Sequence, residues 1–468
     1  MSELWQRPAL TLAADIASGQ VSSREVLEAH LERVAAVNGD LNAIVRLLPD
    51  EACDAADEAD AAVARGDQLA PLHGVPCTVK ENIDLAGTPT TQGVAALAEA
   101  VATQDAPTVT RMRSAGAIPF ARTNLPDFGL RVHTDSSLHG LTRNPWNPNV
   151  TAGGSSGGEG SAIASGMSPI GIGNDIGGSL RNPAHCCGIA SLKPTVGVIP
   201  MATEIPPQDQ GLSSQLMVVE GPMARTVADV RAGLDALAGQ HWRDPRSVSA
   251  VLADNAPGER IRIAVLAPPE GFAVEPGIAA AIHSAADRLA DSGHDVIEAT
   301  PPDIGLVVEQ WLSLLGADIT SQREILDMVM GPDAKALLDT AQDAAPAPSY
   351  PEVTTMHVER YRLLREWAQF FQEHPVLLSP TWARPAFEHG ADVDPETGFE
   401  TMLTTIWPVL PANLLGMPAA ITPAGVTNGL PVGAQVMGDR FNDLRCLTIA
   451  AEIEAGLDPI TPIDPVTT

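Results

Sequence analysis

The sequence predicts an α/β fold, in which helices alternate with strands that are buried in a sheet. Apolar residues recur at helical spacing after capping signals, and short apolar runs lie between turn-forming residues. The clearest case is a strand, a helix and a strand in succession, over 261–266, 276–291 and 295–298. The helix of this unit begins at Pro276 and ends before Gly293. Such alternation is typical of a sheet covered by helices.

The N-terminal segment is predicted to be helical. Ser22 and Glu25 form a capping-box pattern, and the apolar residues that follow recur at helical spacing: Val26, Leu27, Leu31 and Val34. A second helix is expected over 51–65. The next segment, 71–84, indicates a turn, a short buried strand and a polar exit from that strand.

The C-terminal part is predicted to return to buried strands. Short apolar runs at 376–378 and 432–436 indicate two of them, and 441–454 has the pattern of a closing helix. Residues 401–438 carry no charge and are long enough to cross a bilayer. Five prolines within this stretch favour turns and short strands over a membrane helix.

The composition is that of a folded globular protein, with 44% hydrophobic and 18% charged residues. Acidic residues outnumber basic ones by 58 to 28, the formal net charge is −30, and the lysines are Lys80, Lys193 and Lys335. This balance argues against nucleic acid or an anionic membrane as a partner. Five scattered cysteines make no disulfide framework, and the N-terminus lacks a signal-peptide pattern. We therefore expect a cytoplasmic protein.

Two glycine-rich and serine-rich stretches, 153–158 and 170–179, are the strongest candidates for a functional site. A flexible linker is one interpretation of the first stretch, but the second alternates glycines with apolar residues. Neither stretch has the glycine spacing of a phosphate-binding loop. Residues 153–157 match the G-x-S-x-G elbow of α/β-hydrolase-type esterases, with Ser155 as nucleophile. That motif requires a preceding strand, whereas 144–151 is turn-like. A catalytic use of both serines together with a lysine is the third interpretation.

The chain resembles the amidase signature family of serine hydrolases along most of its length, from about residue 10 to 455. The segments that carry the resemblance are ordered and specific: Gly74-Val-Pro-Cys-Thr-Val-Lys80-Glu-Asn, Gly153-Gly-Ser155-Ser-Gly-Gly158, Gly173-Asn-Asp-Ile-Gly-Gly-Ser179 and Leu192-Lys-Pro-Thr195. The resemblance implies an amidase signature fold, a single large α/β/α domain with a mixed central sheet flanked by helices. Its expected parts are a helical segment (1–66), the signature core (70–230), a variable substrate-pocket region (236–405) and a C-terminal return to the core (406–460).

The resemblance also implies a Ser-cisSer-Lys triad. Position by position, Ser179 is the nucleophile that forms the acyl-enzyme, Ser155 the proton relay and Lys80 the base. An ordinary lysine, with a pKa near 10.4, is protonated and cannot accept a proton, so Lys80 must be buried. The alternative for Lys80 is a structural ion pair, for example with Glu81. In the family the peptide bond before the relay serine is cis, and Gly154 in front of Ser155 limits the steric cost.

Other residues are expected to support this triad. Backbone N–H groups of Ile176, Gly177, Gly178 and Ser179 would form the oxyanion hole. Asp175 and Arg181 flank this turn and could form an orienting ion pair or only stabilise the turn. Lys193 is expected to anchor the loop after the signature. The sequence His185-Cys186-Cys187 fits no standard zinc spacing, so the thiols are interpreted as buried core residues and neither a metal nor a cofactor is expected.

The substrate is the open question. The family includes hydrolases of amides, ureas and carbamates and the glutaminase subunit of tRNA-dependent transamidation complexes. That subunit usually carries Thr where this chain has Ile176, which favours a standalone amidase for apolar acyl or aryl amides, with esters and carbamates as further candidates. Transamidation and the Ser155-centred esterase remain alternatives. An apolar pocket wall is expected from Met201, Ile205, Pro207, Leu212 and Trp407. The expected partner is a small-molecule amide, and the expected state a monomer or homodimer.

Overall fold

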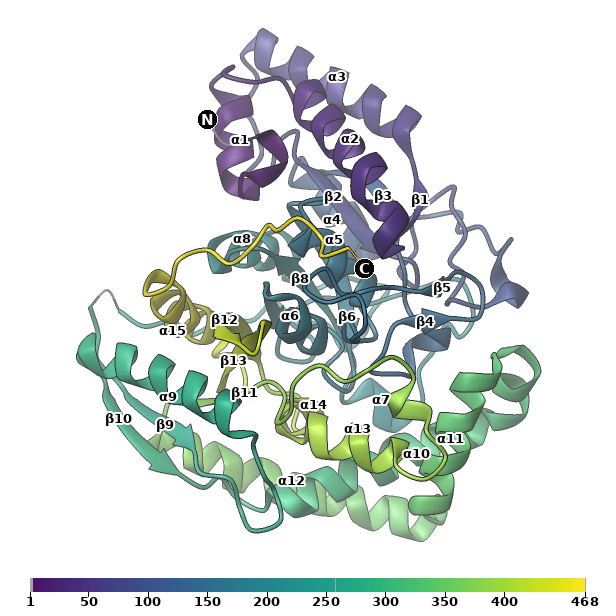
Figure 1. Ribbon diagram of the computed structural model, residues 1–468, viewed down its shortest axis with the longest axis vertical. Coiled ribbons are helices and arrows are strands. Elements are labelled where there is room, and N and C mark those ends of the chain that lie inside the picture. The colour runs from purple at the N-terminus through teal and green to yellow at the C-terminus, as the bar shows by residue number, and fades with distance from the viewer. Residues whose placement is uncertain (1–2, 257, 468) are drawn as a thin grey trace.

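The computed structural model describes residues 3–256 and 258–467, in which helices and strands alternate as predicted (Figure 1). Within these residues an 11-stranded mixed sheet crosses the molecule. Its strands, in spatial order, are β1 (Ile44–Leu47), β3 (Ile118–Thr123), β2 (Pro76–Lys80), β6 (Ile170–Asp175), β8 (Val219–Ala224), β7 (Ala190–Lys193), β12 (Ala419–Thr427), β13 (Leu430–Gly438), β11 (Val376–Pro380), β9 (Arg262–Leu266) and β10 (Asp295–Ala299). A separate two-stranded sheet joins β4 (Asp135–Ser136) to β5 (Gly140–Leu141).

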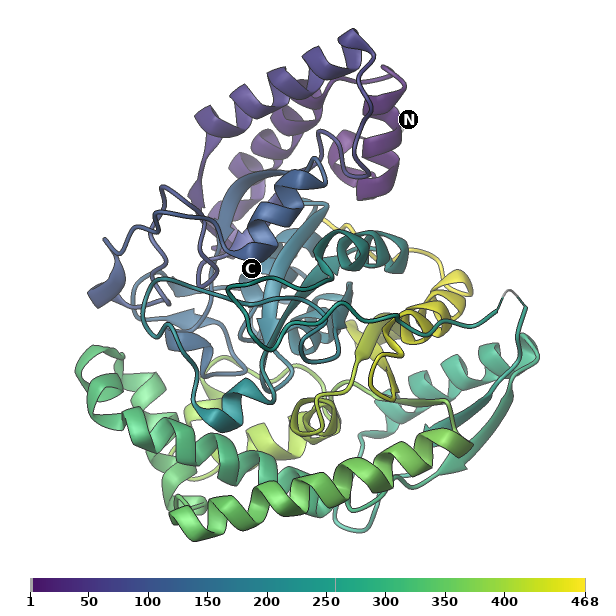
Figure 2. The ribbon, with the colours of Figure 1, turned by 180° about the vertical axis from the view of Figure 1, so that it is seen from behind.

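Helices cover both faces of the sheet, and strand β10 forms an outer edge (Figures 1 and 2). They are α1 (Ala9–Ala17), α2 (Ser23–Leu41), α3 (Pro49–Arg65), α4 (Pro107–Ser114), α5 (Gly157–Ala164), α6 (Arg181–Cys187), α7 (Leu212–Gln215), α8 (Val227–Leu237), α9 (Pro276–Asp291), α10 (Ile304–Val329), α11 (Pro332–Ala344), α12 (Tyr350–Glu373), α13 (Gly398–Ile406), α14 (Leu410–Leu414) and α15 (Asp443–Ala455). The N-terminal helices α1–α3 lie at one end of the molecule, and the long α10 and α12 lie at the other.

Local sequence signals located these elements well. The capping box at Ser22 and Glu25 is formed at the start of α2, and α9 has the predicted bounds. The buried strands expected within 71–84 and over 261–266, 376–378 and 432–436 are β2, β9, β11 and β13. The prediction of an α/β fold with a mixed central sheet is therefore confirmed.

The sheet separates two hydrophobic cores. In β9, Ile263 and Val265 belong to the core that also contains the inner faces of α8, α9 and α15. The alternate residues Ala264 and Leu266 belong to the second core, with residues of α10, α12 and α14. Successive side chains of a strand point to opposite faces, so a continuous apolar run such as this one is what a strand buried on both faces requires.

The uncharged stretch 401–438 forms most of α13, then α14, β12 and β13, so the expected strands are present and two short helices precede them. In the part of the chain that the structure describes, no helix combines the length and apolarity needed to cross a membrane.

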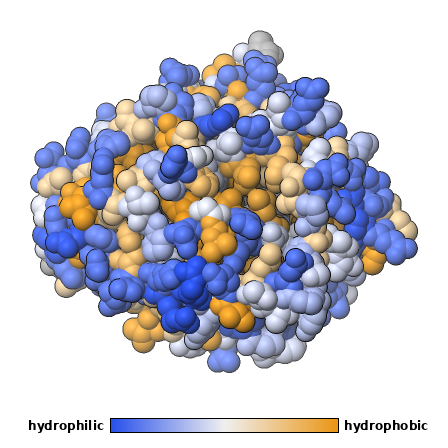
Figure 3. Space-filling view, turned by 90° about the horizontal axis from the view of Figure 1, so that it is seen from below, coloured by the Kyte–Doolittle hydropathy of each residue, from blue (hydrophilic) through white to orange (hydrophobic). Residues whose placement is uncertain are grey.

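Figure 3, which views the molecule from below, shows apolar side chains gathered near the middle of this face among hydrophilic ones.

One part of the sheet determines where the polar motifs meet. Strand β2 pairs in parallel with β6, and Thr78 lies opposite Gly171 in this pairing. The carboxyl ends of parallel neighbours lie at the same edge of a sheet. Lys80, the last residue of β2, and Asn174, the next-to-last residue of β6, are therefore brought together although 94 positions separate them.

Candidate active site

Lys80 ends β2 with its side chain fully buried. Its Nζ donates a hydrogen bond of 2.7 Å to Ser155 Oγ and one of 2.6 Å to Asn174 Oδ1. Asn174 in turn donates from Nδ2 to Asn82 Oδ1 at 2.9 Å. Because its amide nitrogen is engaged by Asn82, Asn174 presents its oxygen to the lysine. The ammonium or amine of Lys80 thus has two neutral oxygen partners.

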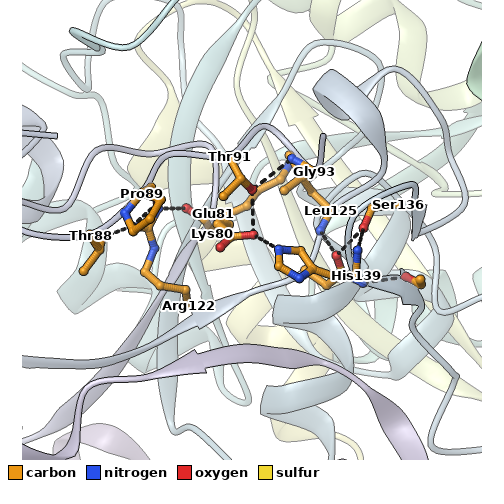
Figure 4. Close-up of polar contacts among 12 residues, drawn as sticks. Lys80, Glu81, Thr88, Pro89, Thr91, Gly93, Arg122, Leu125, Ser136 and His139 are labelled. Carbon is orange, nitrogen blue, oxygen red and sulfur yellow. Dashed lines mark hydrogen bonds and ion pairs between the residues drawn. The ribbon is translucent and has the colours of Figure 1, made fainter. Parts of the chain in front are cut away.

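The surroundings of Lys80 favour its neutral form. Burial lowers the pKa of Lys80 to about 7, although the carboxyl groups of Asp175, Glu159 and Glu220 act in the opposite direction. The alternative of an ion pair with Glu81 is not formed. Figure 4 shows the Glu81 carboxylate directed at Thr91 and His139, and its Oε2 lies 2.8 Å and 2.6 Å from Thr91 Oγ1 and His139 Nε2. No carboxylate of the described residues forms an ion pair with Lys80.

The backbone at Lys80 is held by Arg122, which comes from the neighbouring strand β3 and is fully buried. Its Nη2 donates to the Lys80 carbonyl at 3.2 Å and to the Ile83 carbonyl at 2.7 Å. Its Nη1 contacts Thr88 and Pro89 (Figure 4). This buried guanidinium fixes the end of β2, and with it the base of the Lys80 side chain.

Ser155 lies in the loop before α5, and the Gly154–Ser155 peptide bond is cis, as the resemblance implies. Two glycines close to Ser155, Gly154 and Gly129, have crowded surroundings. A Cβ on Gly154 would lie 2.6–2.8 Å from the backbone of Arg131, Val132 and His133. A Cβ on Gly129, which has φ +69°, would lie 3.1 Å from Ser155 Oγ. Ser155 is therefore preceded by a glycine with no room for a methyl group and is approached closely by a second glycine.

Ser179 lies in the turn that connects β6 to α6, and only 5% of its surface is exposed. It shares a cavity with Ser155 and Asn174. Its carbonyl accepts a hydrogen bond of 3.3 Å from the N–H of Ser156, whereas no hydrogen bond joins the side chains of Ser179 and Ser155. The Lys80–Ser155 link of the expected triad is thus formed, and the link to Ser179 is open.

Three of the four expected oxyanion donors are free. Within the described chain, the N–H groups of Ile176, Gly177 and Ser179 donate to no protein acceptor. The N–H of Gly178 instead donates to Asp175 Oδ1 at 2.8 Å, which corrects the expectation that this residue is an oxyanion donor. The turn is also held from outside, because Trp311 of α10 donates from Nε1 to the Ile176 carbonyl at 2.8 Å.

Asp175 and Arg181 form a fully buried, bidentate ion pair with two N–O distances of 3.0 Å. Burial alone would raise the pKa of Asp175, but the Arg181 guanidinium outweighs it and holds this pKa at about 2. Asp175 also accepts from the N–H of Leu180 at 3.1 Å, and Asn413 from α14 bonds to both partners. The pair therefore orders the turn that carries Ser179.

The cavity in front of Ser155 and Ser179 encloses about 1000 Å³, part of it open to solvent. Of the predicted apolar wall, Met201 and Pro207 line it. The expectation for the other three residues is corrected. Ile205 is buried outside the lining, Leu212 is 62% exposed at the start of α7, and Trp407 packs in the second core with its ring 5.0 Å from that of Phe272.

Lys193 and the segment 185–187 are buried. Lys193 donates to the carbonyls of Pro194 and Met417 at 2.9 Å and 2.8 Å, which confirms that it anchors the loop after β7. Cys186 and Cys187 are buried, as interpreted, and His185 accepts the N–H of Gly433 at its Nδ1. Burial lowers the pKa of His185 to about 3.

Several residues of the site escaped sequence reasoning. Asn174 and Asn82 lie inside the recognised motifs, but nothing local marks an asparagine as a partner of Lys80. Glu220 lines the cavity from β8, and Ile83, Phe128, Leu130 and Leu315 supply apolar surface. The parallel pairing of β2 with β6 is the signal that would have found Asn174.

Comparison with known proteins points to a single protein family. The family model "Amidase" matches residues 25–447. The indoleacetamide hydrolase of Bradyrhizobium diazoefficiens is 40% identical over 96% of this chain and 86% of its own length. A glutamyl-tRNA(Gln) amidotransferase subunit of Acidothermus cellulolyticus is 34% identical over 97% of this chain and 95% of its own. A bacterial aryl acylamidase of the amidase signature family has a similar structure, with a TM-score of 0.82, 27% identity and 97% coverage of both chains.

Proposed function

The chain belongs to the amidase signature family and is an amide-hydrolysing enzyme, and we propose that it cleaves small aryl or apolar acyl amides through an acyl-enzyme on Ser179. The observation that carries this proposal is the 2.7 Å contact between Lys80 Nζ and Ser155 Oγ beside the cavity that Ser179 lines. A serine hydroxyl is a weak nucleophile and needs a neighbouring base. With a pKa of about 7, Lys80 is available as that base at neutral pH.

The proton path of this proposal runs through Ser155. As the Ser179 oxygen attacks the amide carbon, its proton passes to Ser155 Oγ, and the proton of Ser155 passes to Lys80 Nζ. A neutral amine has two N–H donors and one lone pair. One N–H is directed to Asn174 Oδ1, at 2.6 Å, so rotation about the last bond of the side chain can turn the lone pair to Ser155. Asn174 is proposed as a positioning residue for this step.

The negative charge that develops on the amide oxygen needs donors that are already oriented. We assign this role to the N–H groups of Ile176, Gly177 and Ser179, which have no protein acceptor in the described chain. One donor of this kind is typically worth about 3 kcal/mol in the transition state. The protonated Lys80 then returns its proton through Ser155 to the leaving nitrogen, the C–N bond breaks, and water hydrolyses the acyl-enzyme by the same path.

The proposed substrate class follows from the cavity and the relatives. The cavity wall combines aromatic and aliphatic side chains, among them Phe128, Ile83 and Leu130, with scattered polar groups. Such a wall suits an aryl or other apolar group attached to the amide. The relative at 40% identity is an indoleacetamide hydrolase, and we propose an arylacetamide of this type as the first substrate to test, with anilides, esters and carbamates beside it.

Neither alternative function is better supported. Amidotransferase subunits are similar at 34% identity, below the 40% of the indoleacetamide hydrolase. For the Ser155-centred esterase, the segment in front of Ser155 would have to be a strand. Residues 144–151 form turns with isolated bridges at Val150 and Thr151.

The test is turnover by the purified chain alone of indole-3-acetamide, an anilide, an ester, a carbamate and glutamine. We expect acid and ammonia from the arylacetamide, and loss of both turnover and fluorophosphonate labelling in Ser179→Ala. Ser161→Ala is the matched control, because Ser161 is a buried serine of α5 that bonds to the Arg143 carbonyl away from the cavity. Labelling retained in Ser179→Ala and mapped to Ser155 would support the esterase. Glutamine turnover that appears only with partner proteins would support transamidation.

A further inference from the structure

The wall of the active-site cavity holds a buried carboxyl group that the proposed mechanism does not use. Glu220 of β8 is 3% exposed and lines the cavity together with Ser155 and Ser179. In the antiparallel pair of β6 and β8 it lies directly opposite Asn174. Opposed residues of such a pair project from the same face of the sheet. Glu220 is therefore a neighbour of the Lys80–Asn174 contact.

One oxygen of Glu220 is engaged and the other is free. Oε2 accepts a hydrogen bond of 2.5 Å from Thr108 Oγ1. Oε1 has no partner among the described residues. It is not fully buried, in contrast to Glu81 Oε1, which is fully buried and has no partner. The free oxygen of Glu220 thus opens on the cavity. An acceptor that faces the cavity is available to a donor that a ligand brings, and this donor replaces the water that the ligand displaces.

The free oxygen is an acceptor in the carboxylate form, and in the neutral acid it is one when the proton lies on Oε2. Burial raises the pKa of Glu220 to about 8, so at neutral pH the neutral carboxylic acid predominates. A proton on Oε2 is donated to Thr108 Oγ1, which reverses the direction of that hydrogen bond, and Oε1 then keeps the carbonyl character of an acceptor. Asp318 is the other charged residue in the lining, and no Lys, Arg or His is among the described residues there. No cationic side chain of the described lining therefore competes for Glu220 Oε1.

We propose that Glu220 is a specificity residue that accepts a hydrogen bond from an N–H group on the aryl part of the substrate. This inference rests on the proposed function, and it narrows the substrate class to aryl amides whose ring carries a donor, such as a pyrrole-type N–H. The apolar wall binds the ring, and Glu220 Oε1 distinguishes a donor ring from one of equal shape without a donor. A site built around such a bond rejects the analogue that lacks it, because the acceptor is then left buried and unpaired.

The experiment compares indole-3-acetamide with benzothiophene-3-acetamide, in which sulfur replaces the ring N–H at nearly the same shape. We expect kcat/KM of the unaltered enzyme to favour the indole by about tenfold or more. In Glu220→Leu this ratio should fall to about 1, whereas Glu220→Gln, which keeps an acceptor oxygen, should retain part of the preference. Asp318→Asn is the matched control, since it changes the other carboxylate of the wall and should leave the ratio unchanged.

The outcomes separate the two proposals. Equal kcat/KM for the two amides in the unaltered enzyme overturns the role of Glu220 while the amidase activity on them remains. An unchanged ratio in a folded Glu220→Leu variant, as judged by circular dichroism, overturns it as well. Failure to hydrolyse any amide of the panel overturns the proposed substrate class instead. If Glu220→Leu does not fold, the ratio in the unaltered enzyme and in Glu220→Gln decides.

Discussion

Lys80 Nζ and Asn174 Oδ1 lie 2.6 Å apart across the ends of two parallel strands. No carboxylate of the described residues forms an ion pair with Lys80. The consequence is electrostatic. A carboxylate at this position would favour the ammonium form, whereas a neutral amide holds the same donor without adding charge. The lysine is thus fixed in position while burial keeps its pKa at about 7.

Replacing Asn174 by aspartate tests this relationship with almost no change of shape. Asn174→Asp puts a carboxylate in contact with Lys80, and we expect the pKa of Lys80 to rise by about one to three units. The rising limb of kcat/KM against pH should move up by the same amount, and activity at pH 7 should fall. Asn174→Leu, which removes the acceptor without adding charge, should lower kcat without this upward shift. A limb that stays in place in Asn174→Asp contradicts the assignment of Lys80 as the base.

In the unaltered enzyme, kcat/KM should rise with pH up to about pH 7 and then level off. Burial lowers the pKa of Lys80 to about 7, and the neutral amine is the active form. The active fraction therefore grows as the pH rises through 7, and kcat/KM should grow tenfold per pH unit below it. Lys80→Arg should be inactive at every pH between 6 and about 10, because arginine remains protonated in this range. A pH profile of both proteins from pH 5.5 upward measures this, and a limb near pH 10 would disagree with it.

Sequence motifs located the residues that could react, but they did not reveal how these residues are held. Lys80, Ser155 and Ser179 lie in motifs with recognisable spacing, and helix α9 has the bounds that its capping signals predict. Asn174 meets Lys80 because β2 and β6 are parallel neighbours, and Glu220 reaches the cavity because β8 pairs with β6. Strand order is a long-range property that local patterns do not encode. Apolar patterning also fails to separate a cavity wall from a core, which is why the sequence predicts Trp407 in the wall while its ring packs against Phe272 in the second core.

Gly129 provides a test of how tightly Ser155 is enclosed. Its φ is +69° and an added Cβ would lie 3.1 Å from Ser155 Oγ. We expect Gly129→Ala to reduce kcat by about tenfold, since a misplacement of 1 Å can cost about a hundredfold and the shift needed here is smaller. Gly140→Ala is the matched control, because Gly140 has a similar φ of +78° but nothing within 4 Å of the added methyl. Both variants should lose about 1 kcal/mol of stability to backbone strain, and similar kcat losses in the two would show that the methyl contact with Ser155 has no effect.

The ion pair between Asp175 and Arg181 should matter for stability as well as for activity. Both side chains are fully buried, and Asp175 also accepts the N–H groups of Gly178 and Leu180. Asp175→Asn leaves a buried guanidinium without its counter-charge, so the free energy of unfolding should fall by about 3–5 kcal/mol. The turn that carries Ser179 would lose its order, and kcat should fall together with stability.

The control for this variant is a pair at the surface. Arg262 and Asp295 are 2.7 Å apart, but their side chains are 52% and 57% exposed. Solvent screens such a pair, and Asp295→Asn should cost less than about 1 kcal/mol and leave kcat unchanged. Urea unfolding followed by circular dichroism measures both variants. If Asp175→Asn lowers the free energy of unfolding no more than Asp295→Asn does, the charge of Asp175 is not needed to hold the Ser179 turn. Neutral hydrogen bonds would then suffice, because the asparagine side chain keeps one oxygen acceptor for the N–H groups of the turn.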